Sequence, residues 1–199
     1  MKKILLALLM PTLMGSAFSS FAEGGTPQPV KKVTVDGGKI NFTGSIVAAP
    51  CAVDSESSRQ SVDLGQVATN KLVSKGDSSA AVPFTIKLVG CDLTADISDP
   101  SETANYTKAS ITFNGTTNDD DSTLALSGSS GGSTVAKNVG IQILQNNKAL
   151  KVDGSTATTA IDLLNGNNEL PFSVAYVATA DNTVAGIANS TVNFRVTYE

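Results

Sequence analysis

Apolar residues recur at every second position in several short stretches of the chain, and this alternation is typical of β-strands with one buried face. Seven strands are predicted, at Asn41–Val47, Ser61–Val67, Val82–Leu88, Ser110–Asn114, Asn138–Leu144, Phe172–Ala178 and Thr191–Tyr198. Clusters of Gly, Ser, Asn and Asp lie between these stretches, and they favour turns. Short strands with frequent turns indicate an all-β fold, and we expect an immunoglobulin-like β-sandwich.

The last of these strands has the clearest pattern. Its apolar side chains alternate without a break, and Gly186 precedes them at the fourteenth position from the end of the sequence. A final apolar strand with an open edge invites pairing by another chain. An ordinary last strand of a closed sandwich remains the alternative interpretation. The alternating residues are Val192, Phe194, Val196 and Tyr198.

The first 22 residues have the features of a secretory signal peptide. Lys2 and Lys3 precede an apolar run, and small residues lead to a predicted cleavage site after Ala22. The run is shorter than the roughly 20 apolar residues that a membrane span needs. Cleavage leaves 199 − 22 = 177 residues, enough for one domain. We therefore predict a signal peptide at 1–22, an N-terminal extension at 23–40 and a domain at 41–199.

The extension ends in two apolar pairs that do not share one alternation. Val33 and Val35 are followed by Gly37, and the apolar positions then shift to Ile40 and Phe42. This shift across Gly37-Gly38 predicts two strand-forming pieces joined by a hinge or a bulge. A local hairpin turn at Asp36-Gly37 is the alternative.

Composition argues against several classes of function. Without Lys2 and Lys3 the chain carries 12 basic and 18 acidic residues, a net charge of 12 − 18 = −6. Its scattered basic residues argue against binding to nucleic acid or to an anionic membrane surface. The chain contains no histidine, which removes the Ser–His dyad, histidine metal sites and a histidine general base. We predict no catalytic residue, no enzyme activity, no cofactor and no metal site. The polar run Asp119–Asp121 is interpreted as a solvated turn, with a weak Ca²⁺ site as the alternative.

Cys51 and Cys91 are the two cysteines of the chain. In an exported protein such a pair most simply forms one disulfide. A bridge that closes a 40-residue span stabilises the fold by about 4 kcal/mol in the chain-entropy model. A metal-binding or redox pair is the alternative, which the absence of histidine and of CxxC spacing disfavours.

Taken together, these motifs resemble pilins of the chaperone–usher pathway, and specifically the type 1 fimbrial major subunits. The resemblance begins with the stretch Thr34–Cys51 and extends over nearly all of the chain after the signal peptide. It ends with the glycine fourteen residues from the end, the alternating strand and the penultimate tyrosine. The other matching segments are Val62–Val67, Phe84–Cys91 and Asn138–Leu144.

The resemblance implies an incomplete immunoglobulin-like sandwich that lacks its last strand. In this family a periplasmic chaperone first fills the resulting groove, and a donor strand from the N-terminal extension of the next subunit then replaces it. The implied partners are neighbouring copies in a homopolymer, the chaperone and an outer-membrane usher, without nucleic acid or a membrane span. The implied donor residues are Val33, Val35, Gly37, Gly38 and Ile40, and the groove strand comprises Gly186, Val192, Phe194, Val196 and Tyr198.

The sequence therefore predicts a structural subunit of an adhesive surface fimbria, exported through the periplasm. Donor arm and groove are different surfaces of one chain, and such head-to-tail contacts build open filaments. Two alternatives remain: a minor adaptor or terminator pilin, and a stand-alone secreted β-sandwich that binds carbohydrate.

Overall fold

The computed structural model describes residues 30–94, 105–128 and 134–199. The chain divides into two units, Met1–Gly44 and Ser45–Glu199. In the first unit, the described residues 30–44 are exposed and contain no helix or strand. The predicted signal peptide lies outside the described residues.

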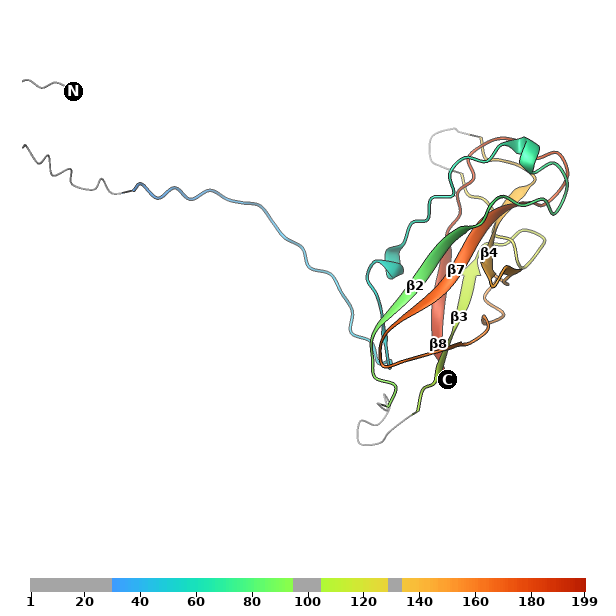
Figure 1. Cartoon of the computed structure of the whole chain (residues 1–199). Coiled ribbons are helices and arrows are strands. Elements are labelled where there is room, and N and C mark those ends of the chain that lie inside the picture. The colour runs from blue at the N-terminus through green and yellow to red at the C-terminus, as the bar shows by residue number, and fades with distance from the viewer. Residues whose placement is uncertain (1–29, 95–104, 129–133) are drawn as a thin grey trace, which may run out of the picture. The chain divides into compact units, whose positions relative to one another are not determined.

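The second unit contains two antiparallel sheets (Figure 1). In the five-stranded sheet, the order is β1-β2-β7-β4-β5, and in the three-stranded sheet it is β6-β3-β8. Two short 3-10 helices, at Ser57–Arg59 and Thr69–Lys71, lie between β1 and β2. The fold is all-β, as predicted, and its two sheets form a sandwich. The strands are β1 Ala52–Val53, β2 Val82–Cys91, β3 Lys108–Gly115, β4 Val139–Gln145, β5 Lys148–Ala149, β6 Ile161–Asp162, β7 Gly166–Ala178 and β8 Val192–Tyr198.

The two sheets face each other through their apolar sides. The ring of Phe113 in β3 meets the ring of Phe172 in β7 edge to face, with centroids 5.4 Å apart. Phe84 of β2 stacks on the same Phe172 ring at 5.7 Å. These rings join the sheets into one core, which confirms the buried faces predicted for β2 and β7.

Two predicted strands are not strands in this chain. Residues 41–47 pair with no other segment, and Phe42 is 90% exposed. Residues 61–67 also form no ladder, although Val62 and Leu64 pack against the core. Alternation is necessary for a half-buried strand but does not supply a hydrogen-bonding partner. Both predictions of strand structure were therefore wrong, for want of a partner among the described residues.

The alternating pattern also missed parts of the sheets. β7 begins at Gly166 because its polar first residues pair with the end of β2, as in Lys87↔Glu169. β1, β5 and β6 have two residues each, too few to display an alternation. The hairpin considered at Asp36-Gly37 is not formed, since residues 30–44 contain no strand.

Candidate strand-binding groove

A groove of about 1010 Å³ runs between the two sheets of the second unit. One side is formed by residues 57–65, and the other by residues 188–194, which include the start of β8. Between them lies an apolar floor to which β2, β3, β4 and β7 all contribute. The residues of this floor include Phe84, Ile86, Phe113, Ile141, Ile143, Val174 and Tyr176.

The apolar side chains of β8 face this core but do not close it. Phe194 and its three alternating neighbours are half-buried, whereas the residues between them, such as Arg195 and Thr197, are exposed. By contrast, Ile111 and Phe113 on the neighbouring strand β3 are 0% and 2% exposed. The predicted parity of β8 is thus confirmed, and the structure adds that its inward face is incompletely covered.

Both sides of the groove present an unpaired backbone edge. β8 pairs with β3 from Ala109↔Tyr198 to Gly115↔Val192 and is the edge strand of its sheet. Across the groove, residues 61–65 take part in no ladder or isolated bridge, and within them the Gly65 N–H donates to the Asp63 carboxylate at 2.8 Å. An edge strand carries a row of free N–H and C=O groups that a further strand can pair with. The groove therefore combines an apolar floor with two backbone edges to which a further strand could hydrogen-bond.

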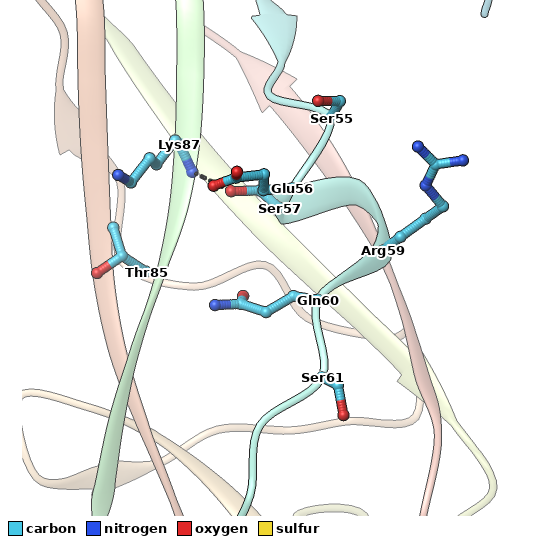
Figure 2. A pocket seen from close by; sticks show the side chains of 8 residues that line it. All are labelled: Ser55, Glu56, Ser57, Arg59, Gln60, Ser61, Thr85 and Lys87. Carbon is cyan, nitrogen blue, oxygen red and sulfur yellow. Dashed lines mark hydrogen bonds between the residues drawn. The ribbon is translucent and has the colours of Figure 1, made fainter. Parts of the chain in front are cut away.

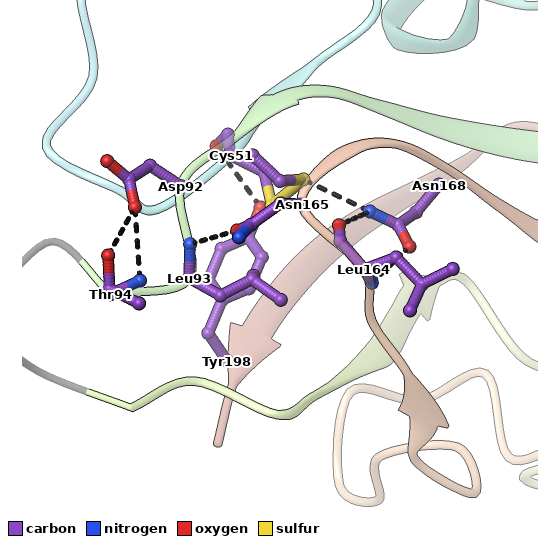
Figure 3. The surroundings of a disulfide bond; sticks show 9 residues. Cys51, Asp92, Leu93, Thr94, Leu164, Asn165, Asn168 and Tyr198 are labelled. Carbon is purple, nitrogen blue, oxygen red and sulfur yellow. Dashed lines mark hydrogen bonds between the residues drawn. A yellow bond between two sulfur atoms is a disulfide. The ribbon is translucent and has the colours of Figure 1, made fainter.

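Tyr198 anchors the end of β8 to the disulfide region (Figure 3). Its hydroxyl donates a hydrogen bond to the backbone carbonyl of Cys51 at 3.2 Å. Its ring meets Tyr106 edge to face, with centroids 6.4 Å apart. Burial raises the pKa of Tyr198 above its ordinary value.

The predicted disulfide between Cys51 and Cys91 is formed. The two residues are 3% and 6% exposed, and the side-chain amide of Asn168 donates to the sulfur of Cys91 at 3.3 Å. Cys51 directly precedes β1 and Cys91 ends β2, so the bridge secures the strands that lead into the groove. A bridged pair is unavailable for metal binding, so the metal-binding alternative for this pair is wrong.

Gly186 lies six residues before β8 and has a packing role of its own. A methyl group at this position would lie 2.5 Å from the carbonyl oxygen of Thr134 and 2.6 Å from the carbonyl carbon of Val135. Hydrogen bonds of 2.9 Å from Ile187 to Thr134 and from Ala136 to Ile187 hold the two segments at this separation. Only glycine permits this close approach of the two backbones.

Replacing Gly186 with alanine is expected to destabilise the subunit by about 1–3 kcal/mol, because a backbone segment has to shift to make room. The midpoint of urea denaturation of the purified subunit measures this change. Gly37→Ala is the matched control, since nothing lies within 4 Å of its added methyl group. A midpoint for Gly186→Ala equal to that of the control would contradict the packing role.

A second, polar pocket of about 640 Å³ lies beside the outer edge of β2 (Figure 2). Ser57 accepts a hydrogen bond from the backbone N–H of Lys87 at 3.0 Å, and the ammonium of Lys87 lies 3.5 Å from Glu169. Arg59 points away from Thr85 and Lys87 in Figure 2. These contacts attach residues 55–61 to β2, and the polar groups do not converge on a common point.

The acidic loop that contains Asp120 is stabilised by its own hydrogen bonds. The Asp120 carboxylate accepts from the backbone N–H and the hydroxyl of Ser122, both at 2.9 Å, and these bonds lower the pKa of Asp120. Asp121 pairs with Lys151 at 3.4 Å. Over the described ranges, no group of three or more His, Cys, Asp or Glu side chains is arranged to hold a metal ion. The same ranges contain no helix long and apolar enough to cross a membrane.

The donor residues predicted in the N-terminal extension lie on the exposed arm. The exposed fractions of Val33, Val35, Ile40 and Phe42 lie between 74% and 90%. Gly38 has a φ of +110°, in the region that favours glycine. The arm therefore exposes its apolar side chains to solvent, and the pairing of the arm with a groove stays a prediction.

The family model for fimbrial proteins matches residues 40–199. The chain belongs to the fimbrial protein family. This fimbrial subunit is 40% identical to the type-1 fimbrial protein A chain of Escherichia coli over 191 residues, covering 94% of this chain and 98% of that protein. It is 40% identical to the S-fimbrial protein subunit SfaA of Escherichia coli, covering 92% and 96% of the two chains. It is 37% identical to long polar fimbria protein A of Salmonella typhimurium, covering 100% and 98%.

Solved structures place the fold among pilus subunits. A chaperone–usher pilus subunit is similar with a TM-score of 0.63 and 26% identity, over 85% of this chain and 99% of that chain. The P pilus rod subunit PapA is similar with a TM-score of 0.59 and 26% identity, over 76% and 100%. The fimbrial subunit is therefore a structural component of fimbriae on the cell surface.

Sequence reasoning identified one side of the groove and missed much of the rest. Residues 188–190 and Leu124 line the groove, but they belong to no predicted strand. The alternation of Val62 and Leu64 was the available signal for the opposite side, and it was interpreted as a complete strand. Bridges between distant segments, such as Leu124↔Ile141, leave no local pattern in the sequence.

Proposed function

We propose that this fimbrial subunit polymerises head-to-tail, with residues 33–42 of one copy inserted as a strand into the groove of the next. The inserted strand lies between β8 and residues 61–65 and pairs with both. The observation that carries this proposal is an apolar groove with two unpaired edges in a chain whose own arm exposes apolar side chains. The inserted strand begins in the predicted extension, residues 23–40, and includes the first two residues of the predicted pilin domain, residues 41–199.

The energetics support insertion as the step that completes the fold. Burial of four apolar side chains supplies roughly 6–12 kcal/mol as an upper bound. Backbone hydrogen bonds to both edges set the register of the inserted strand. Because arm and groove are different surfaces, each copy accepts one neighbour and donates to another, which extends a homopolymer without closing it.

A groove that awaits its donor needs protection on the way to the surface. An apolar floor and free backbone edges that are exposed together favour aggregation. A periplasmic chaperone that lends a strand covers both, and an outer-membrane usher then hands the subunit to its neighbour. The similarity to a chaperone–usher pilus supports this route of export through the periplasm.

Deletion of residues 23–38 tests the donor role. The shortened subunit is expected to be bound by its chaperone but to form no filaments, because the groove remains while the donor is lost. Electron microscopy of a strain with this variant as its sole subunit measures filament formation, and copurification measures chaperone binding. Deletion of residues 23–29 is the matched control and should leave filaments intact, since Val33 to Phe42 remain.

Filaments of normal length from the larger deletion would refute donor function. The same experiment addresses the minor-subunit alternative, because an adaptor or terminator yields no long filaments even as the intact sole subunit. A stand-alone carbohydrate-binding sandwich predicts that neither deletion changes the surface filaments.

A further inference from the structure

We infer that Asn165 is a site of spontaneous deamidation in the folded subunit, and that the backbone N–H of Leu93 promotes the reaction. Asn165 is exposed and directly precedes β7, whose first residue is Gly166. A glycine after an asparagine leaves the backbone nitrogen unshielded by a side chain, so that nitrogen can reach the neighbouring side-chain amide. Every protein group that the reaction needs lies within one chain, so it does not depend on polymerisation.

The chemistry is a ring closure followed by hydrolysis. The backbone nitrogen of Gly166 loses its proton and attacks the side-chain carbonyl carbon of Asn165. A carbon–nitrogen bond forms, and the side-chain nitrogen takes up a proton and leaves as ammonia, so that a five-membered succinimide remains. Water then opens the ring at either carbonyl and gives aspartate or isoaspartate. No group is oxidised or reduced, and solvent water is the only co-reactant.

Leu93 supplies a donor at the atom where charge develops. Its backbone N–H donates to the side-chain oxygen of Asn165 at 2.9 Å (Figure 3). This oxygen becomes negatively charged when the carbonyl carbon is attacked, and a fixed N–H donor stabilises that charge. The hydrogen bond engages the oxygen and not the nitrogen that leaves. Leu93 therefore favours the charged intermediate without holding the leaving group.

The surroundings of Gly166 leave room for the ring. A methyl group on Gly166 would meet nothing within 4 Å, and its φ of +96° lies in the region that glycine adopts readily. A succinimide constrains the backbone of both residues, so it forms where the chain can adjust. Asn165 lies outside the strands, and only the second residue of the pair belongs to a ladder.

The second Asn-Gly pair of the chain is held more firmly and provides a control within the same molecule. Asn114 and Gly115 both lie in β3 and pair with β8. The N–H of Gly115 donates to the carbonyl of Val152 at 2.8 Å, which engages the nitrogen that would attack. A methyl group on Gly115 would lie 2.5 Å from the side chain of Leu124, so this site is also crowded.

The modification changes the subunit where β7 begins. Either product adds one negative charge beside the N–H of Leu93, and isoaspartate also inserts a methylene into the main chain just before Gly166. β7 is the central strand of the five-stranded sheet, and Gly166 pairs with Cys91. Because the reaction needs no enzyme, the modified fraction rises with the age of the protein.

Incubation of the purified subunit tests this site, with peptide mass spectrometry as the measure of deamidation at both Asn-Gly pairs. In the folded subunit Asn165 is expected to react at least about tenfold faster than Asn114. In the urea-denatured chain the two rates are expected to become similar, because glycine follows both residues. Equal rates in the folded subunit, or a faster rate at Asn114, overturn the inference. So does an unmodified Asn165 after the time in which the denatured chain reacts.

Two variants of Leu93 isolate the contribution of its N–H. Leu93→Pro removes this donor and Leu93→Ala keeps it, while both lose the packing of the leucine side chain against the core. Leu93→Pro is expected to slow deamidation of Asn165 roughly tenfold relative to Leu93→Ala. The rate at Asn114 reports whether the proline variant is folded, since unfolding raises it to the denatured value, and the comparison of the two sites in the wild-type subunit then decides. Equal rates at Asn165 in the two variants, with Asn114 unchanged, overturn the role of Leu93.

Discussion

Replacing Phe194 with aspartate is expected to abolish accumulation of the subunit in the periplasm. Phe194 lines the groove and pairs across the sheet with Phe113, which is 2% exposed. An aspartate there sets an unpaired charge against the core and removes an aromatic side chain, at a cost of roughly several kcal/mol. That loss is comparable with the whole stability of a small domain, about 5–15 kcal/mol. Immunoblotting of periplasmic extracts from a chaperone-positive strain measures it.

Thr197→Asp is the matched control for that variant. Thr197 belongs to the same strand but to its exposed face, opposite Ser110 of β3. The same new charge stays in water there, and surface substitutions of this kind usually change stability by less than about 0.5 kcal/mol. Equal periplasmic levels of the two variants would contradict the prediction that folding depends on the inward face of β8 and not on its outward face.

The double substitution Cys51→Ser and Cys91→Ser is expected to lower the free energy of unfolding by about 4 kcal/mol. The disulfide closes a 40-residue span, and the Cys51 carbonyl also accepts a hydrogen bond from the hydroxyl of Tyr198. We therefore expect a lower periplasmic yield and a lower urea midpoint for the purified subunit.

Thiol labelling provides the control for the disulfide prediction. The wild-type subunit, denatured without reductant, is expected to show no reactive thiol. Two reactive thiols under these conditions would contradict the bridge, and an unchanged urea midpoint of the double variant would contradict its contribution to stability.

The long strands could be predicted because alternation and burial coincide in them. β2, β4 and β8 each pack one apolar face against the core, and each was visible as a period of two. Residues 41–47 have the same pattern but no partner among the described residues, so the pattern alone overestimated the sheet. The two-residue strands are determined by long-range pairing, as in Ala109↔Ile161, which leaves no periodic signal.

The candidate site was predictable in the same uneven way. The inward face of β8 could be predicted from the sequence. The floor of the groove could not, because it is formed only when strands of both sheets pack together. Gly186 was noticed through its position in a motif. Its physical reason, the close approach of residues 134–136, depends on a contact across about 50 positions of sequence.

The anchoring of β8 at both ends has a consequence for the kinetics of assembly. Before the strand, Ser127 donates to Asn189 at 2.8 Å, and after it Lys108 and Glu199 exchange hydrogen bonds of 2.9 and 3.0 Å. Together with the Tyr198 anchor, these contacts hold the outer edge of β8 in an extended shape within the single subunit. In the proposed head-to-tail insertion, the loss of conformational freedom then falls mainly on the arm that enters the groove. Under that proposal, the sequence of the arm governs how fast a filament grows more than the acceptor domain does.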